Sequence, residues 1–208
     1  IIEARLSEIS VKEFEERFDR FTRLWRKHAL PNAEALTHVR AVYDAQLYYA
    51  DRGIGHIMEW LNGFGFQNDT LIVITADHGQ EFGEHGKWAE HAQLYDELLR
   101  VPLIIAGPGV SPGKPLTQLV SSIDIVPTVL GLLGVPAPHS ARGASLVPIL
   151  QGRTQDEVHR ALYATVFGDV AVRTREWKWI KHPDGRQELY QLSKDPKERD
   201  NLADRDPA

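Results

Sequence analysis

The chain has 208 residues, and its 24 Lys and Arg against 29 Asp and Glu give a net charge of −5, with 42% hydrophobic residues. These values are typical of a globular protein that is long enough to bury its own core, so they exclude a disordered chain. The absence of cysteine excludes disulfides, thiolate ligands and a cysteine nucleophile within these residues, and the acidic balance argues against nucleic-acid binding.

Two helices are predicted in the first third of the chain. Apolar residues spaced three and four apart predict a helix that begins at Ser10 and ends before Pro31. The same spacing predicts a second helix over about residues 35–61, ended by Gly63. The chain starts with Ile1 rather than Met and shows no signal-peptide pattern. We therefore expect a piece of a longer protein, whose localisation stays unknown.

Two apolar runs follow, at residues 70–76 and 101–106, with a predicted helix over residues 89–99 between them. Both runs are far shorter than the roughly 20 residues that a membrane helix needs, so no membrane-spanning segment is predicted. Their uniform apolarity is typical of buried strands. The order strand, helix, strand predicts a right-handed parallel crossover.

A short third strand is predicted at residues 119–121, followed by a helix that Asp124 caps and that ends at Gly134. Trp177 and Trp179 alternate with Lys178, which indicates one core face and one wet face more than a sugar or nucleic-acid platform. Four short segments separated by turn residues predict an antiparallel meander, near residues 161–167, 170–175, 177–181 and 188–192. The domain prediction is an α/β core over residues 1–154 and an antiparallel β subdomain with a polar tail over residues 155–208.

The loop over residues 76–91 carries most of the chemistry, since it contains three His, one Asp, three Glu and one Lys. Asp77 and His78 come directly after a predicted strand, at the strand end where parallel α/β sheets bind ligands. A carboxylate and an imidazole together suit a divalent cation. Glycines in the loop allow His85 and His91 to return toward the same point. The alternatives are a turn-capping Asp77 and a merely solvated loop.

Several blocks of residues, in the same order and spacing, resemble the sulfatase family of the alkaline-phosphatase superfamily. The blocks are Tyr43-Asp-Ala-Gln-Leu-Tyr-Tyr-Ala-Asp51, Asp69-Thr-Leu-Ile-Val-Ile-Thr-Ala-Asp-His-Gly79, Gly83-Glu-His-Gly86, Leu94-Tyr-Asp-Glu-Leu-Leu-Arg-Val-Pro-Leu-Ile104, Ser122-Ile-Asp-Ile-Val-Pro-Thr128, Leu189-Tyr190, Asp195-Pro196 and Asn201-Leu202.

The resemblance implies an alkaline-phosphatase-like α/β fold, with a mainly parallel sheet flanked by helices and a small carboxyl-terminal antiparallel subdomain. It implies that Asp77 and His78 ligate one divalent cation, which is calcium in a sulfatase and manganese or zinc in a phosphatase-like enzyme. It also assigns the binding of the ester oxygens to His91, with His85 and Lys87 as competitors.

One expected family motif is missing. Sulfatases are expected to carry a Cys or Ser, converted to formylglycine, in a Cys/Ser-x-Pro-x-Arg motif, and no segment of this chain fits it. We therefore expect the carboxyl-terminal portion of a sulfatase, inactive alone, acting in full length on a small-molecule or carbohydrate sulfate ester. The alternatives are a phosphomonoesterase or phosphodiesterase of the same superfamily, and a non-catalytic fragment. Association through an open sheet edge is also expected.

Overall fold

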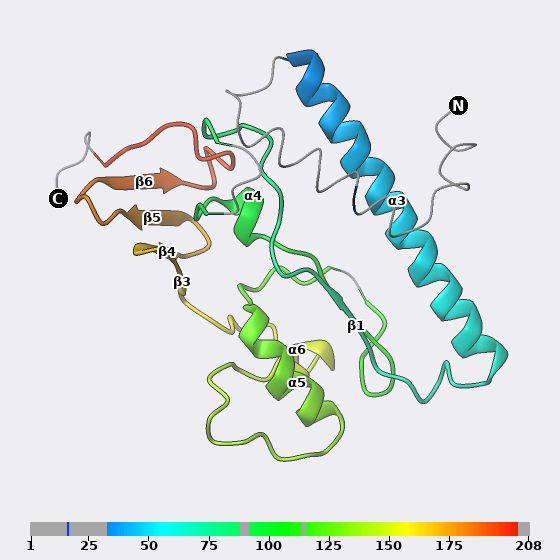
Figure 1. Ribbon diagram of the computed structural model, residues 1–208. Helices are drawn as coiled ribbons and strands as arrows, with labels where there is room; N and C mark the ends of the chain where they lie inside the picture. The colour runs from blue at the N-terminus through cyan, green and yellow to red at the C-terminus, as the bar shows by residue number, and fades with distance from the viewer. Residues whose placement is uncertain (1–15, 17–32, 88–91, 114, 204–208) are drawn as a thin grey trace. The chain divides into compact units, whose positions relative to one another are not determined.

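The computed structural model describes residue 16 and residues 33–87, 92–113 and 115–203 (Figure 1). The chain divides into two compact units, residues 1–49 with 80–91 and residues 50–79 with 92–208. Within these ranges no helix is both long and apolar enough to cross a membrane.

Helix α3, Ala33–Gly63, confirms the predicted second helix and runs two residues beyond it at each end. The helix predicted from Ser10 to Pro31 lies outside the described residues, apart from Glu16. In the first unit, the loop after Gln80 packs on the start of α3. Arg40 pairs with Glu84 at 3.2 Å between Nη2 and Oε1, and Tyr43 meets the ring of Phe82 edge-on at 5.3 Å between centroids.

The two apolar runs form strands, but the predicted parallel crossover is wrong. Strand β1, Ile72–Thr75, pairs with β2, Leu103–Ala106, in antiparallel register, with Thr75 opposite Leu103. A parallel return usually needs a crossover helix of substantial length. The helix described between these strands is α4, Asp96–Leu99, whose four residues span about 6 Å. The chain therefore enters β2 at the end where β1 finishes.

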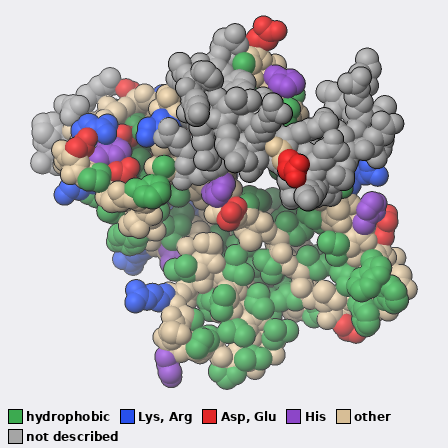
Figure 2. Space-filling view, viewed as in Figure 1, with side chains coloured by type: hydrophobic (Ala, Val, Ile, Leu, Met, Phe, Trp, Pro, Cys, Tyr) green, Lys and Arg blue, Asp and Glu red, His purple; other side chains and the backbone are tan. Residues whose placement is uncertain are grey.

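The faces of β1 and β2 are less buried than the sequence predicted. The three Ile and Val residues of β1 are half-buried, and Ile104 of β2 is 54% exposed. Figure 2 shows hydrophobic side chains gathered over the lower part of the view, where α5, Ile125–Leu132, lies. Its neighbours Ile123 and Leu133 are 55% and 62% exposed.

We expect the 208-residue chain to self-associate. In the part of the chain that the structure describes, the β1–β2 sheet has two strands, so each strand has an edge to which another copy can pair. Size-exclusion chromatography with light scattering is expected to give a mass that rises with concentration. A monomer at every concentration would contradict this expectation.

Asp124 organises the segment that precedes the carboxyl-terminal sheet. The predicted strand at residues 119–121 is absent there, and the chain enters the 3-10 helix η1, Ser122–Asp124, and then α5. The fully buried Asp124 carboxylate accepts hydrogen bonds from the Ser121 and Ala144 backbone N–H groups. Leu119 stays irregular because its N–H donates to the Glu157 side chain rather than to a strand. Helix α6, Val147–Leu150, follows.

The predicted antiparallel meander is confirmed (Figure 1). Its strands pair in chain order: β3 Leu162–Val166, β4 Asp169–Arg173, β5 Trp177–Lys181 and β6 Gln187–Gln191. The core of this part comprises Leu94, Ala171, Ile180, Tyr190 and Leu192. Leu94 belongs to the segment before α4, so the sheet and that segment share one core. The domain boundary between residues 154 and 155 stays a prediction.

Candidate functional site

The Asp77–His78 pair lies just past the end of β1, as predicted. Both side chains are exposed, and Asp77 Oδ1 accepts the His78 backbone N–H at 3.0 Å. His78 Nδ1 lies 2.7 Å from the Gly79 carbonyl oxygen. A carbonyl oxygen only accepts, so Nδ1 carries the hydrogen and, in the neutral ring, Nε2 carries the lone pair. Nε2 lies 3.7 Å from Asp77 Oδ2.

This geometry fits two ligands of one divalent cation. Ligand distances of about 2.0 to 2.6 Å allow one ion to touch two atoms that are 3.7 Å apart. The tautomer of His78 presents Nε2 rather than a hydrogen to that position, and the Nδ1–H bond to a carbonyl is the usual support of a metal-binding imidazole. No group of three or more His, Asp or Glu suited to a metal occurs among the residues described, so the metal role of the pair stays a prediction.

Gly79 fixes this pair to helix α4. Its backbone N–H donates to the Leu98 carbonyl oxygen at 2.8 Å. A Cβ atom on Gly79 would overlap the carbonyl oxygen of Glu97. The backbone after His78 therefore rests directly on α4, and only glycine allows this approach.

Replacing Gly79 by alanine is expected to lower the free energy of unfolding by about 1 to 3 kcal/mol, because the added methyl group forces two backbone segments apart. Urea unfolding of the Gly79→Ala variant measures this loss. Gly113→Ala is the matched control, since Gly113 has no left-handed φ and a Cβ there meets only the Ser111 carbonyl oxygen, at 3.6 Å. Equal losses in both variants would show that the contact with α4 is unimportant.

The other predicted site residues lie in the first unit. His85 is half-buried and Lys87 is exposed, while His91 lies outside the described residues. Their roles in binding ester oxygens stay predictions.

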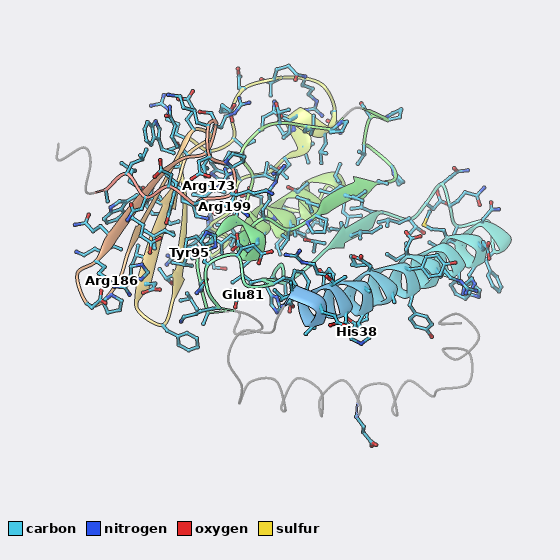
Figure 3. All side chains as sticks on the ribbon, turned by 90° about the horizontal axis from the view of Figure 1, so that it is seen from above. His38, Glu81, Tyr95, Arg173, Arg186 and Arg199 are labelled. Atoms are coloured by element: carbon cyan, nitrogen blue, oxygen red, sulfur yellow. The ribbon has the colours of Figure 1, made fainter. Side chains whose placement is uncertain are left out.

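A buried charge cluster that the sequence did not predict lies at the start of α4. Its four members are Asp96, Arg173, Lys178 and Glu198. Lys178 Nζ lies 2.7 Å from Glu198 Oε1 and 2.9 Å from Asp96 Oδ1. Arg173 donates hydrogen bonds from Nε and Nη2 to the same Asp96 carboxylate. Tyr95 and Arg173, labelled in Figure 3, mark this junction between α4 and the sheet.

The pKa of Asp96 reflects the cluster. Burial raises the pKa of its carboxyl group, but the hydrogen bonds from Arg173 and the charge of Lys178 outweigh burial and hold the pKa below its usual value. Asp96 therefore stays ionised, and its stabilising contribution is lost as pH falls through its lowered folded-state pKa.

A second charge cluster joins β4, β5 and β6 through His182. Its Nδ1 donates to Asp169 Oδ1 at 3.1 Å and its Nε2 donates to Glu188 Oε1 at 2.8 Å. Glu188 also accepts the hydroxyl groups of Tyr95 and Tyr190, each at 2.7 Å. Burial lowers the pKa of His182, but the two carboxylates raise it by more, so it lies above its usual value.

This raised pKa predicts a pH dependence of stability. The contribution of His182 is fully present below its unfolded-state pKa of about 6.5 and is lost as pH rises through the higher folded-state pKa. In the His182→Gln variant we expect the free energy of unfolding to lack this decrease between pH 6 and pH 9. Urea unfolding across that pH range measures it. The exposed His139→Gln variant is the control and should keep the wild-type profile. An unchanged profile in His182→Gln would contradict the assignment.

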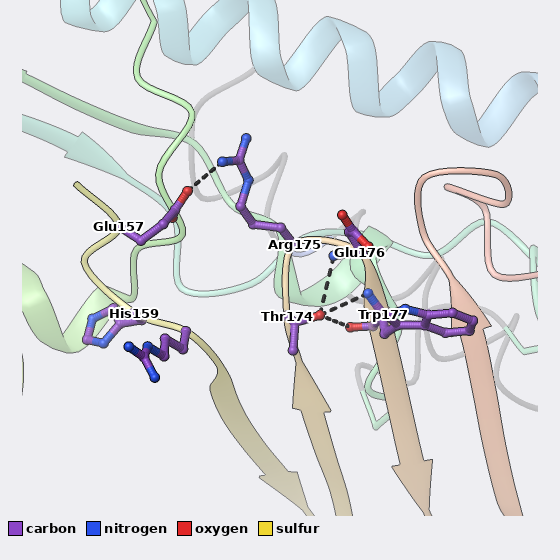
Figure 4. Close-up of a pocket in the computed structure, with 7 residues that line it drawn as sticks. Glu157, His159, Thr174, Arg175, Glu176 and Trp177 are labelled. Atoms are coloured by element: carbon purple, nitrogen blue, oxygen red, sulfur yellow. Dashed lines mark hydrogen bonds and ion pairs between the residues drawn. The ribbon is translucent and has the colours of Figure 1, made fainter. Parts of the chain in front are cut away.

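A shallow pocket lies between residues 157–160 and the turn from β4 to β5 (Figure 4). Arg175 on its rim pairs with Glu157, and His159 Nε2 bonds to the buried Asp124 at 2.8 Å. Thr174 Oγ1 accepts the backbone N–H of Trp177 at 3.0 Å and closes the turn. These groups are engaged with one another, so the pocket is a weaker candidate than the Asp77–His78 pair.

Two family models match the chain. The model named Sulfatase matches residues 10–135, and the model named N-sulphoglucosamine sulphohydrolase, C-terminal, matches residues 83–208. The choline-sulfatase of Rhizobium meliloti is 34% identical over 82% of this chain, and the Delta 4,5-hexuronate-2-O-sulfatase of Bacteroides thetaiotaomicron is 32% identical over 85%. This chain spans 34% and 39% of their respective lengths.

Solved structures agree with these matches. A protein solved in complex with its substrate D-glucosamine-2-N,6-O-disulfate matches this chain with a TM-score of 0.70 and 27% identity. The match covers 92% of this chain and 42% of the chain in that structure. The phosphonate monoester hydrolase of Silicibacter pomeroyi matches with a TM-score of 0.76 and 28% identity. This match covers 85% of this chain and 39% of the hydrolase chain. The predicted alkaline-phosphatase-like α/β fold is thereby confirmed.

Proposed function

The chain belongs to the sulfatase family, and from this premise we propose that the complete protein that carries it hydrolyses sulfate monoesters with a divalent cation. The observation that carries the proposal is the Asp77–His78 pair, whose Oδ2 and Nε2 atoms are 3.7 Å apart directly after β1. The pair lies within the segment that the sulfatase model matches.

Each site residue has a proposed role. Asp77 and His78 hold the cation, for which we propose calcium. When bound, the cation neutralises charge on the sulfate group and lowers the pKa of the attacking group. His91, with His85 and Lys87 as competitors, binds the ester oxygens. The nucleophile, a formylglycine, comes from outside these 208 residues, so we expect no turnover from this chain alone.

We propose a sulfated carbohydrate as the substrate. Support comes from a relative named as a hexuronate sulfatase and from a similar structure that was solved with a glucosamine disulfate substrate. The family-model match over residues 83–208 carries the name of a sulphohydrolase of N-sulphoglucosamine and points to the same class.

Sulfate release by the complete protein tests the proposal. Sulfated glucosamine and sulfated unsaturated hexuronate are incubated with the enzyme, and free sulfate is measured by ion chromatography. We expect release that a chelator stops and that added calcium restores. No release from any sulfated sugar, in a folded protein with calcium present, would contradict the proposed function.

A phosphoester or phosphonate ester hydrolase is the second candidate. It is favoured by the likeness to a phosphonate monoester hydrolase, with a TM-score of 0.76. In that case manganese or zinc replaces calcium at Asp77 and His78, because a nitrogen ligand suits those ions better. The third hypothesis, a non-catalytic fragment, predicts neither activity.

A further inference from the structure

We propose that Lys178 and Glu198 are positioning residues for the cation site: through α4, they fix where Asp77 and His78 lie. The inference rests on the proposed metal role of that pair. It assigns to the carboxyl-terminal sheet a part in metal affinity, although neither residue touches the pair itself.

The Asp77–His78 pair is tied to α4 through Gly79. Gly79 follows His78 directly, and its N–H donates to the Leu98 carbonyl oxygen at 2.8 Å. The lack of a side chain lets the Gly79 Cα approach the Glu97 carbonyl. A displacement of α4 therefore moves the backbone that carries His78.

Helix α4 does not hold its own position. It has four residues, and the side chain of Tyr95 at its amino end makes no capping hydrogen bond. One turn of helix has no independent stability in water. Its place depends on what it packs against.

The buried charge cluster at Asp96 anchors α4. Glu198 Oε2 accepts the Asp96 backbone N–H at 2.6 Å, and its other oxygen pairs with Lys178 at 2.7 Å. Lys178 also pairs with the Asp96 side chain at 2.9 Å. The side chains of Lys178 and Glu198 are both 0% exposed. Water therefore does not weaken these contacts.

The backbone of Glu198 gives an independent indication. Its φ is 52°, in the left-handed region that glycine adopts more easily than glutamate. The carboxylate at this strained position makes two of the contacts that hold α4. Strain of this kind persists where the surrounding contacts over-determine the conformation.

Calcium binding by the complete protein, measured by titration calorimetry, tests the inference. The Lys178→Met/Glu198→Gly double variant removes both buried charges and relieves the left-handed backbone. We expect it to raise the calcium dissociation constant by about 10-fold, the lower end of the effect of losing groups that bond to metal ligands directly, because these two residues act through α4. Glu198→Gln keeps the shape but loses one acceptor, and it is expected to weaken binding as well.

Ile149→Ala, a buried truncation in α6 away from the cluster, is the control for general destabilisation. All variants are titrated at a temperature at which circular dichroism shows them folded. The inference is wrong if the double variant and Glu198→Gln keep the wild-type dissociation constant, or if Ile149→Ala weakens binding equally. Asp77→Ala separates the two proposals, because calcium binding that survives Asp77→Ala refutes the metal site itself.

Discussion

Replacing Asp77 by alanine is expected to abolish tight binding of the divalent cation and to reduce turnover of the complete protein by orders of magnitude. Asp77 supplies the carboxylate oxygen that faces His78 Nε2 at 3.7 Å. With that oxygen gone, the described part of the site keeps one ligand, and a single ligand does not hold a catalytic ion.

His78→Asn is expected to have a milder effect, since an amide oxygen also coordinates hard cations. Metal analysis and initial rates measure both variants, with the exposed Asp69→Ala before the same strand as the control. If Asp77 only caps its turn, Asp77→Ala will instead cost about 0.5 to 2 kcal/mol of stability and leave the metal content unchanged.

Replacing Lys178 alone by methionine is expected to lower the free energy of unfolding by about 3 to 5 kcal/mol, because it leaves the buried carboxylate of Glu198 without its cation. Urea unfolding at neutral pH measures the loss. The exposed Lys181→Met variant on the same strand is the control and should change stability by less than about 0.5 kcal/mol.

The double variant Lys178→Met/Glu198→Gly is expected to be more stable than Lys178→Met, since no uncompensated charge is left at position 198. A loss below about 1 kcal/mol in Lys178→Met would contradict the buried pair, because such a value is typical of exposed ion pairs.

Local patterns predicted much of the fold. The spacing of apolar residues gave α3 within two residues at each end. Alternation and turn residues gave the four-stranded meander, where Gly185 takes a φ of 90° in the turn before β6. Both patterns depend on neighbours within a few residues of each other.

The direction of β2 was not predictable in the same way. An apolar run indicates a strand but does not set its direction, which depends on the connection that precedes it. The sequence suggested a helix over residues 89–99, and the described helix there is four residues long.

The burial of Lys178 was also beyond local pattern. Its alternation with Trp177 indicated one wet face, but the structure buries Lys178 beside Ile180 and leaves Trp177 38% exposed. The reason is long-range pairing, since Asp96 lies 82 positions away in the chain. The one indication in the sequence was the two-residue spacing of Lys178 and Ile180, which puts both side chains on the same face of β5.

The sequence predicted where the candidate site residues lie along the chain but not their local geometry. The position of Asp77 and His78 after a strand follows from the order of residues, whereas the His78 tautomer depends on the carbonyl of Gly79. The metal role of Asp77 and His78, the further ligands, and the roles of His85 and His91 all stay predictions.

The central claim, sulfate monoester hydrolysis, is tested most directly by the selectivity of the complete protein. Its kcat/KM is measured in parallel on nitrophenyl sulfate and nitrophenyl phosphate, with calcium present, beside the Asp77→Ala variant. We predict a higher kcat/KM for the sulfate ester and loss of both activities in the variant. Faster turnover of the phosphate ester, or full activity in Asp77→Ala, would contradict the account.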